Sequence, residues 1–496
     1  MDNKTTSRIL ASAVTALEHS VVPAVTIDSS STILDIVIRT LSMLEAHYGR
    51  REQDLEQLIK ASQALLDEVV TENIKPVATD ISMLDRLESE KNIINEHIAD
   101  KIPALIESSA GNDERAKQSV ELLRKIVTTQ ADFYASQDPN ILKGSADVYR
   151  GGRIDRPEKV DEVDKFDEIT DATLTKYLQY KFPEIPEIFA TSVSILLGGF
   201  SKTTILFDLH KPDMIVEHCV IRKDLSSDFL MMEKTVIDEY PLLEKVFKAG
   251  LNVAEPLWIE TNKSWLNGSF IVSRVVAGTS DIGKWIANSS TVSQQLAEIL
   301  AELHNYDLST MGFDAELSGL SAGEAIRNEI LHWQGLYEKY RSSRHPLLEI
   351  GFAWTLNNIP RELFDRAGRI VHGDVGFHNL MVDEGKITAL LDWEFGHFGD
   401  PAEDLIYVRP FVENIADWDE FVRHYCNAGG KVYSKEVETF YKVWSFVRNA
   451  SATRHAQYLF ENHLPDEIKL ALPAWIHGFY LELDASKLVL DILSSK

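Results

Sequence analysis

The chain has 496 residues, 44% of them hydrophobic and 26% charged, so it is long enough for two or three domains with large buried cores. Its 77 aspartates and glutamates outnumber 50 lysines and arginines, and the formal net charge of −27 argues against nucleic acid or an anionic membrane surface as the main partner. The two cysteines, Cys219 and Cys426, exclude a disulfide framework and a thiolate metal cluster.

No apolar stretch is long and unbroken enough for a membrane span, and the N-terminal stretch MDNKTTSRILASAVTALEHS has no clean signal-peptide core. We therefore expect a soluble, unexported protein of the reducing cytoplasm, with no membrane partner.

Residues 1–137 have apolar positions at steps of three and four, as in ERAKQSVELLRKIVTTQADFYASQ, and almost no glycine. Ser30 and Ser31 offer N-cap oxygens for an early helix. This pattern predicts an all-α bundle with short polar connections. Because no cluster of catalytic residue types stands out, we interpret it as a packing module or the contact surface of a homo-oligomer.

Residues 138–184 are charged and dotted with glycine, which is typical of a linker or a loosely packed wrap. Residues 185–279 then show β-rich runs, among them ATSVSILL, MIVEHCVIRKDL and GSFIVSRVV, and residues 280–496 are mostly helical. The sequence therefore predicts an α+β protein in which a small β-rich lobe precedes a larger helical lobe.

The clearest chemistry lies in IVHGDVGFHNLMVDEGKITALLDWEFGHFGDPAEDL, residues 370–404. Asp374 follows His372 by two positions, and Asn379 directly precedes a predicted hairpin that turns at residues 383–385 and ends at Asp392. Strand pairing brings the two ends of a hairpin together, so we expect Asn379 and Asp392 to meet near Asp374.

Phosphoryl transfer requires these residue types, because a carboxylate must accept the proton of the attacking hydroxyl while oxygen ligands hold Mg²⁺ against the nucleotide phosphates. The spacing favours Asp374 as the catalytic base, with Asn379 and Asp392 as metal ligands. Asp400 and Asp404 are interpreted instead as a cap and a loop brace at the start of a helix.

The same stretch resembles the aminoglycoside phosphotransferase and choline kinase family, a branch of the protein-kinase-like fold. The family's HGDxxxxN loop is matched at residues 372–379, its metal-binding aspartate at Asp392, and its trailing GDP and DL elements at residues 399–401 and 404–405. The resemblance covers roughly residues 185–490. It implies a bilobal fold, ATP and Mg²⁺ as cofactors, and a small molecule with a hydroxyl group as substrate.

On the nucleotide side, the turn LGGFSKT contains Gly198, Gly199 and Ser201, whose backbone amides are candidates for contact with the phosphates. The resemblance implies that a basic residue on a strand contacts the phosphates and is tethered by an acidic residue on the following helix. Arg222 and Glu239 fall at these positions. Arginine replaces the lysine of many kinases, and it can bind phosphate in a bidentate manner.

Lys223 remains an alternative to Arg222, and Glu233 remains an alternative to Glu239. The resemblance also implies that backbone groups around Ser273 and Val275 meet adenine at the hinge between the lobes. The helix QQLAEILAELHNYD resembles the family's first large-lobe helix, and we interpret His304 within it as a packing or bracing residue.

Candidates for the acceptor site come from the residues after the metal-binding aspartate and from a C-terminal helical segment: Trp393, Glu394, His397, Arg409 and Arg448. Arg448, with Arg454, suggests the hypothesis of an anionic acceptor such as an organic acid or an acyl-CoA. The identity of the acceptor itself is not fixed by the fold.

Two other functions remain open. Protein kinase activity would use the same chemistry, but the step from Asp392 to Gly399-Asp400-Pro401 leaves no room for a long activation segment. An ATP-binding regulatory or scaffold protein would use the N-terminal helices to bind a partner, although the presence of the base and both metal ligands argues against a catalytically dead domain.

Overall fold

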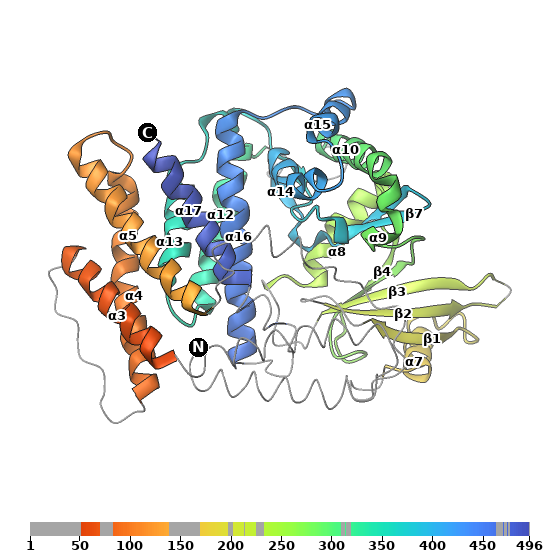
Figure 1. Cartoon of the computed structure of the whole chain (residues 1–496). Coiled ribbons are helices and arrows are strands. Elements are labelled where there is room, and N and C mark those ends of the chain that lie inside the picture. The colour runs from red at the N-terminus through yellow and green to blue at the C-terminus, as the bar shows by residue number, and fades with distance from the viewer. Residues whose placement is uncertain are drawn as a thin grey trace.

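The computed structural model describes residues 51–69, 83–137, 169–196, 202–212, 214–224, 233–308, 313, 319–462, 470, 474 and 477–495. Within them, a small lobe built on one β-sheet lies beside a larger helical lobe (Figure 1). The predicted α+β class, with a β-rich lobe followed by a helical lobe, is confirmed.

The small lobe contains a five-stranded antiparallel sheet in the order β1-β2-β3-β5-β4. The strands are β1 (Phe189–Leu196), β2 (Lys202–His210), β3 (Glu217–Asp224), β4 (Pro256–Glu260) and β5 (Phe270–Arg274). Side chains alternate between the two faces of a strand, so β5 sends Phe270 and Val272 into one core and Ile271 into another. Helix α8 (Val236–Lys248) packs on the Ile271 face.

The opposite face of the sheet is covered by helix α7 (Asp171–Lys181), which begins at an N-cap formed by Thr170. Leu174, Tyr177 and Leu178 of α7 are buried against the sheet. The predicted linker of residues 138–184 therefore ends in a packed helix rather than a loose wrap. Its charged residues at 138–168 lie outside the described part of the chain.

The large lobe has a core of long helices and a patch of short strands that carries the loops of interest. The helices are α9 (Ile282–Trp285), α10 (Ser289–Asn305), α12 (Ala322–Tyr340), α13 (Pro346–Asn357), α14 (Ala402–Glu413), α15 (Trp418–Asn427), α16 (Lys435–Asn462) and α17 (Gly478–Ser494). The predicted hairpin is present as β7 (Leu380–Asp383) and β8 (Lys386–Leu390). A second pair, β6 (Arg369–Val371) with β9 (His397–Gly399), was not predicted.

The described N-terminal residues form the helices α3 (Arg51–Val69), α4 (Met83–Ser108) and α5 (Glu114–Gln137), in agreement with the all-helical prediction; Ser30 and Ser31 lie outside the described residues. These helices share one hydrophobic core with the large lobe, in which α4 contacts α13 and α5 contacts α17 (Figure 1). Ion pairs join Arg341 to Glu96, at 2.6 Å between Nη1 and Oε1, and Arg344 to Asp100. The N-terminal helices are thus packed as an extension of the helical lobe.

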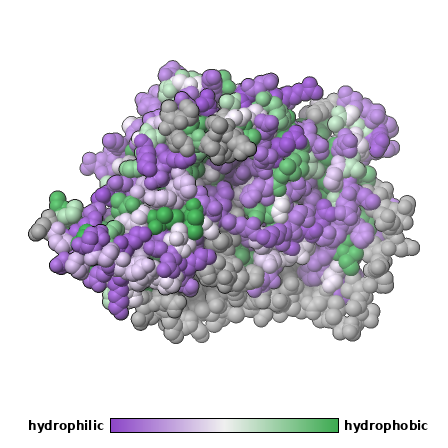
Figure 2. Space-filling model, turned by 180° about the vertical axis from the view of Figure 1, so that it is seen from behind, coloured by the Kyte–Doolittle hydropathy of each residue, from purple (hydrophilic) through white to green (hydrophobic). Residues whose placement is uncertain are grey.

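Hydrophilic residues cover most of the described part of the face seen in Figure 2, and hydrophobic residues gather there in small, separate patches. None of the helices that the structure describes is long and apolar enough to cross a membrane.

Candidate active site

The loop after β6 is held by a buried aspartate, Asp404, at the start of α14. The backbone amides of His372 and Gly373 each donate to one carboxylate oxygen of Asp404 at 2.8 Å. The His304 ring contacts the same carboxylate at 3.0 Å and the Tyr425 hydroxyl at 2.9 Å. Asp404 and His304 therefore brace the loop from behind, in the role predicted for them.

The turn at Gly373 requires glycine. Its φ of +78° lies in the left-handed region, and a Cβ at this position would lie 2.6 Å from the Phe395 carbonyl oxygen. The neighbouring His372 is fully buried; its Nδ1 accepts from the Asp374 amide at 3.2 Å and its Nε2 donates to the Leu391 carbonyl at 2.9 Å. These partners define the ring tautomer and tie the loop to the end of the hairpin.

Asp374 and Asn379 are in direct contact. The Asn379 Nδ2 donates to the Asp374 carboxylate at 2.8 Å and to the Asp374 carbonyl at 2.9 Å. Burial acts to raise the pKa of Asp374, but hydrogen bonds and charge from His378 and a hydrogen bond from Tyr407 hold the pKa well below its usual range. Asp374 is therefore an ionised carboxylate at neutral pH, able to accept hydrogen bonds.

Asp392 comes to the same place from the other end of the hairpin. The amide of the preceding residue, Leu391, donates to the Asn379 carbonyl at 2.8 Å, and Asp392 itself has left-handed backbone angles, φ 68° and ψ 68°. Burial and the charge of Asp374 both act to raise the pKa of Asp392. The charge of Arg222 and its hydrogen bond outweigh them, so the pKa is lowered. The three predicted side chains therefore converge.

This donor set fits a magnesium ion that also binds phosphate. Because the Asn379 Nδ2 is used by Asp374, its amide oxygen remains for a metal, and Asp392 adds a carboxylate. Among the described residues, no group of three or more His, Cys, Asp or Glu side chains is placed to hold a metal ion. Mg²⁺ is usually held by one or two protein oxygens together with substrate phosphates and water, which is what these two residues allow.

Arg222 on β3 contacts acidic residues of both lobes. Its Nη2 donates to the Asp392 Oδ1 at 2.9 Å, and its Nη1 lies 3.7 Å from the Glu239 Oε1 on α8. Glu239 is buried, and its other carboxylate oxygen has no hydrogen-bond partner within the described residues. Lys223 points to the other face of the strand, where its Nζ donates to the carbonyls of Asp224 at 2.9 Å and Asn267 at 3.4 Å.

Gly198, Gly199 and Ser201 lie outside the described residues. The first described residue after them, Lys202, is buried, with its Nζ 3.5 Å from the Asp224 Oδ1 and 3.7 Å from the Glu394 Oε2. Sequence reasoning missed this lysine, although a basic residue directly after a glycine turn and at the head of a strand was a usable signal.

The hinge candidates lie at the end of β5. Ser273 is buried and pairs with Val220 and Pro256 within the sheet. The Val275 amide donates to the His218 carbonyl at 2.9 Å, so it is already bonded to the sheet, and the Val275 side chain is exposed. Val275 therefore presents an exposed apolar side chain, while its amide is used within the sheet.

The first acceptor candidates occupy three different environments. Trp393 is buried against the His372 ring, with its indole N–H bonded to the Leu390 carbonyl at 3.0 Å, so it belongs to the core and not to an open aromatic wall. Glu394 faces the small lobe, near Lys202 and 4.0 Å from the Arg222 Nη2. His397 lies 3.2 Å from the Glu403 carboxylate.

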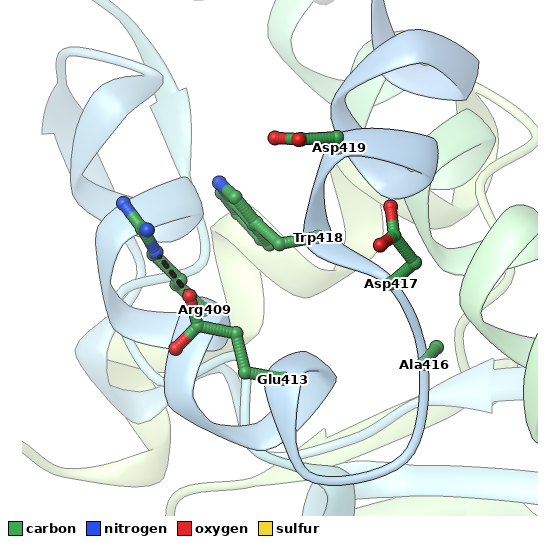
Figure 3. Close-up of a pocket in the computed structure, with 6 residues that line it drawn as sticks. All are labelled: Arg409, Glu413, Ala416, Asp417, Trp418 and Asp419. Carbon is green, nitrogen blue, oxygen red and sulfur yellow. Dashed lines mark hydrogen bonds and ion pairs between the residues drawn. The ribbon is translucent and has the colours of Figure 1, made fainter.

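Arg409 lines a shallow pocket of about 370 Å³, together with other residues of α14, α15 and the loop that joins them: Glu413, Ala416, Asp417, Trp418 and Asp419 (Figure 3). Its Nε donates to Glu413 at 2.7 Å and its Nη1 to Glu438 at 3.1 Å, and its guanidinium lies over the Trp418 ring. The charge of Arg409 is thus neutralised by Glu413 and Glu438, and its contacts lie within this surface and not at Asp374.

Arg448 is only 1% exposed, so it cannot present its charge to solvent. Its Nη1 donates to Glu403 at 3.1 Å, and its guanidinium lies over the rings of Phe395 at 5.0 Å and Tyr407 at 5.3 Å. Arg454 is likewise buried, and its Nε donates to Glu482 at 2.6 Å. Both arginines are paired inside the helical lobe.

Tyr407 is a site residue that the sequence did not reveal. It contacts Asp374 through its hydroxyl from the second turn of α14, between Arg448 and the Phe411 ring. A tyrosine within a helix carries no motif, so only the fold could place it beside the base.

Residues 197–440 match the model of the phosphotransferase enzyme family. The acyl-CoA dehydrogenase family member 11 of Gallus gallus is 25% identical over 323 residues, which cover 58% of this chain and 40% of that relative. The uncharacterised protein YcbJ of Bacillus subtilis is 28% identical over 187 residues, 36% of this chain and 56% of the relative. The chain thus spans only part of the length of the curated relatives it matches.

Among solved structures, the aminoglycoside phosphotransferase APH(4)-Ia aligns with a TM-score of 0.42 and 17% identity, covering 62% of this chain and 99% of the other. The resemblance found at the HGDVGFHN loop is confirmed by the match to the family model.

Proposed function

We propose that this chain, whose residues 197–440 belong to the phosphotransferase enzyme family, transfers the γ-phosphate of ATP to a hydroxyl group of a small molecule. The observation that carries the proposal is the convergence of Asp374, Asn379 and Asp392 with Arg222 at the junction of the two lobes. A hydroxyl nucleophile, a metal and a triphosphate each find the residue types that phosphoryl transfer requires there.

Asp374 receives the acceptor. Its carboxylate accepts a hydrogen bond from the attacking hydroxyl, aligns the oxygen for in-line attack, and takes the proton as the new O–P bond forms and the bond to the leaving ADP breaks. Because the pKa of Asp374 is low, proton transfer belongs late in this step, as expected for a loose transition state. Asn379 and Tyr407 hold the carboxylate in position.

Arg222 steadies the donor phosphates, and Glu239 fixes its guanidinium from α8. Asn379 and Asp392 would hold Mg²⁺, which when bound neutralises the charge on the phosphates. Before a metal binds, Arg222 already neutralises Asp392, so the carboxylate is kept ionised for its ligand role. Gly198, Gly199 and Ser201 stay predictions as phosphate contacts, and Ser273 and Val275 as adenine contacts.

The experiment is a screen of pooled hydroxyl compounds with Mg-ATP that detects a phosphate-sized gain in mass. Asp374→Asn is the blank, and Asp383→Asn, at the exposed end of β7, is the matched control. We expect Asp374→Asn to lose about 10²- to 10⁴-fold in turnover while it still binds ATP, since general-base catalysis contributes that much. Near-normal turnover of Asp374→Asn on a verified substrate would refute the assignment.

The proposed acceptor class is as broad as the sequence left it, namely a small molecule with a hydroxyl group. Because Arg448 and Arg454 are both paired with buried glutamates, they give no support to an anionic acceptor. The name of the Gallus gallus relative is nevertheless a reason to include hydroxyl compounds carrying an acyl-CoA group in the screen. The acceptor roles of Trp393, Glu394, His397 and Arg409 stay predictions.

Protein kinase activity is less well supported. Between Asp392 and α14 the chain forms a short 3₁₀ turn and β9, which leaves no activation segment.

We further propose, from its two cysteines, that the protein works in a reducing compartment such as the cytoplasm. Homo-oligomer formation through the N-terminal helices and a scaffold role stay predictions.

A further inference from the structure

Helix α8 carries Glu239, whose carboxylate lies next to the Arg222 guanidinium and helps to position it. Its first turn is well defined on the small-lobe side: Thr235 is the N-cap, with a capping box to Asp238, and the Val236 amide donates to the Asp224 Oδ1 on β3 at 3.0 Å. These contacts fix where α8 starts, but they do not connect it to the large lobe, which holds the metal ligands and the base.

Besides the apolar packing of α8 on residues 393–395, the two residues that precede Thr235 make polar contacts with the large lobe. The Glu233 Oε1 accepts hydrogen bonds from the Lys339 Nζ and the Tyr340 hydroxyl, both at the end of α12 in the large lobe. The Lys234 Nζ donates to the carbonyl of Glu394 at 3.3 Å, two residues beyond Asp392. Two adjacent side chains thus reach from the start of α8 to separate parts of the other lobe.

The backbone of Glu233 supports a defined role. Its φ is +54°, a left-handed conformation that non-glycine residues rarely adopt and that persists where surrounding contacts hold it. Glu233 was an alternative to Glu239 as the partner of Arg222; its contacts instead cross to the large lobe.

The large-lobe end of this contact is anchored. The Tyr340 ring stacks on His455 of α16, with centroids 4.1 Å apart and planes at 9°. His455 is buried in the long helix that forms much of the large-lobe core. A hydrogen bond from the Tyr340 hydroxyl therefore ties Glu233 to a rigid body and not to a mobile side chain.

We propose that Glu233 and Lys234 form an inter-lobe latch that positions α8, and so presents Glu239 and Arg222 to the donor phosphates. The latch concerns positioning residues and rests on the proposed function. Exposed ion pairs contribute little singly. Here the ion pair of Glu233 with Lys339 acts together with the Tyr340 hydroxyl and the Lys234 contact. Loss of the Glu233 contacts should therefore loosen the helix α8 that follows.

A charge swap tests the latch. Lys339→Glu, Glu233→Lys and the double variant are compared by hydrogen exchange of residues 236–248 and by the affinity for Mg-ADP. We expect each single variant to speed exchange in α8 and to weaken Mg-ADP binding about 3- to 10-fold, and the double variant to recover most of both, as for a direct pair. Lys248→Glu is the control, since Lys248 pairs with Glu244 within α8 alone, at 2.9 Å.

Unchanged exchange and affinity in both single variants would overturn the latch, and so would a double variant that is as impaired as the two singles combined. A change of the same size in Lys248→Glu would also overturn it, because the effect would then belong to the helix and not to the contact between lobes. If the wild-type protein binds no Mg-ADP, the proposed function fails, while the exchange measurement still decides the latch.

Discussion

Asp404→Asn tests how far the catalytic loop depends on one buried carboxylate. Asp404 is fully buried and accepts from the His372 and Gly373 amides at 2.8 Å and from the His304 ring at 3.0 Å. An asparagine of the same shape has one acceptor oxygen, so its NH₂ group must face a buried donor. One unsatisfied buried group costs about 1–3 kcal/mol and loss of a buried charged partner about 3–5 kcal/mol, so we expect a loss of about 3 kcal/mol.

The assay is guanidinium unfolding followed by tryptophan fluorescence, with Mg-ATP turnover measured in parallel. Burial acts to raise the pKa of Asp404, but the hydrogen bond and the charge of His304 lower it by more, so the pKa lies below its usual value. The stabilisation is therefore present above the unfolded pKa of about 3.9 and lost as the pH falls through the lower folded pKa. The deficit of the variant should accordingly shrink in acid. A variant within about 0.5 kcal/mol of the wild type at pH 7, a change typical of surface sites, would refute the bracing role.

Three further predictions follow from the same structure. The pKa of His397 is raised to about 9 because the charges of Glu329 and Glu403 outweigh its burial. Protonated His397 therefore stabilises the folded state by about 3 kcal/mol, fully below about pH 6.5 and no longer once the pH has passed 9. Unfolding of His397→Gln should lack that pH dependence. Gly373→Ala should cost at least about 1–3 kcal/mol, since a left-handed alanine is strained and its Cβ would meet the Phe395 carbonyl, and it should remove turnover; normal melting and turnover would contradict this. Leu123→Ala in α5 should cost about 2–5 kcal/mol in the unfolding of the large lobe, and a loss confined to a separate N-terminal transition would show that the shared core does not act as one unit.

The parts of the site that the sequence predicted are those set by local chain geometry. Asn379 and Asp392 meet because a tight turn at Gly385, with φ of +80°, closes the hairpin between them. Arg222 faces Asp392 of the large lobe and Lys223 does not, because side chains alternate along β3. Residue type and hairpin geometry were enough for Asn379 and Asp392, whereas Lys223 stayed an alternative to Arg222 until the structure showed that the two side chains lie on opposite faces of β3.

The parts that it did not predict depend on partners far away in the chain. Arg448 looked available for a ligand until α14 supplied Glu403, 45 residues earlier, to pair with it. β6 and β9 span three residues each, too few to show a strand period, and they pair across the whole catalytic loop. The apolar faces of α4 and α5 indicated a bundle, but periodicity does not say which helices complete it.

The shared core of the N-terminal helices and α17 has a consequence for how the protein is made. The Arg124 Nη2 donates to the Ser494 Oγ at 3.0 Å across 370 residues of sequence, beside the packing of α5 on α17. During synthesis, α3 to α5 emerge long before α17 and can pack on one another, but the apolar surface that α5 buries against α17 stays exposed until α17 has been translated. Closing so long a loop is slow, and exposed apolar helices aggregate meanwhile. The large lobe therefore reaches its native packing only after α17 has been translated.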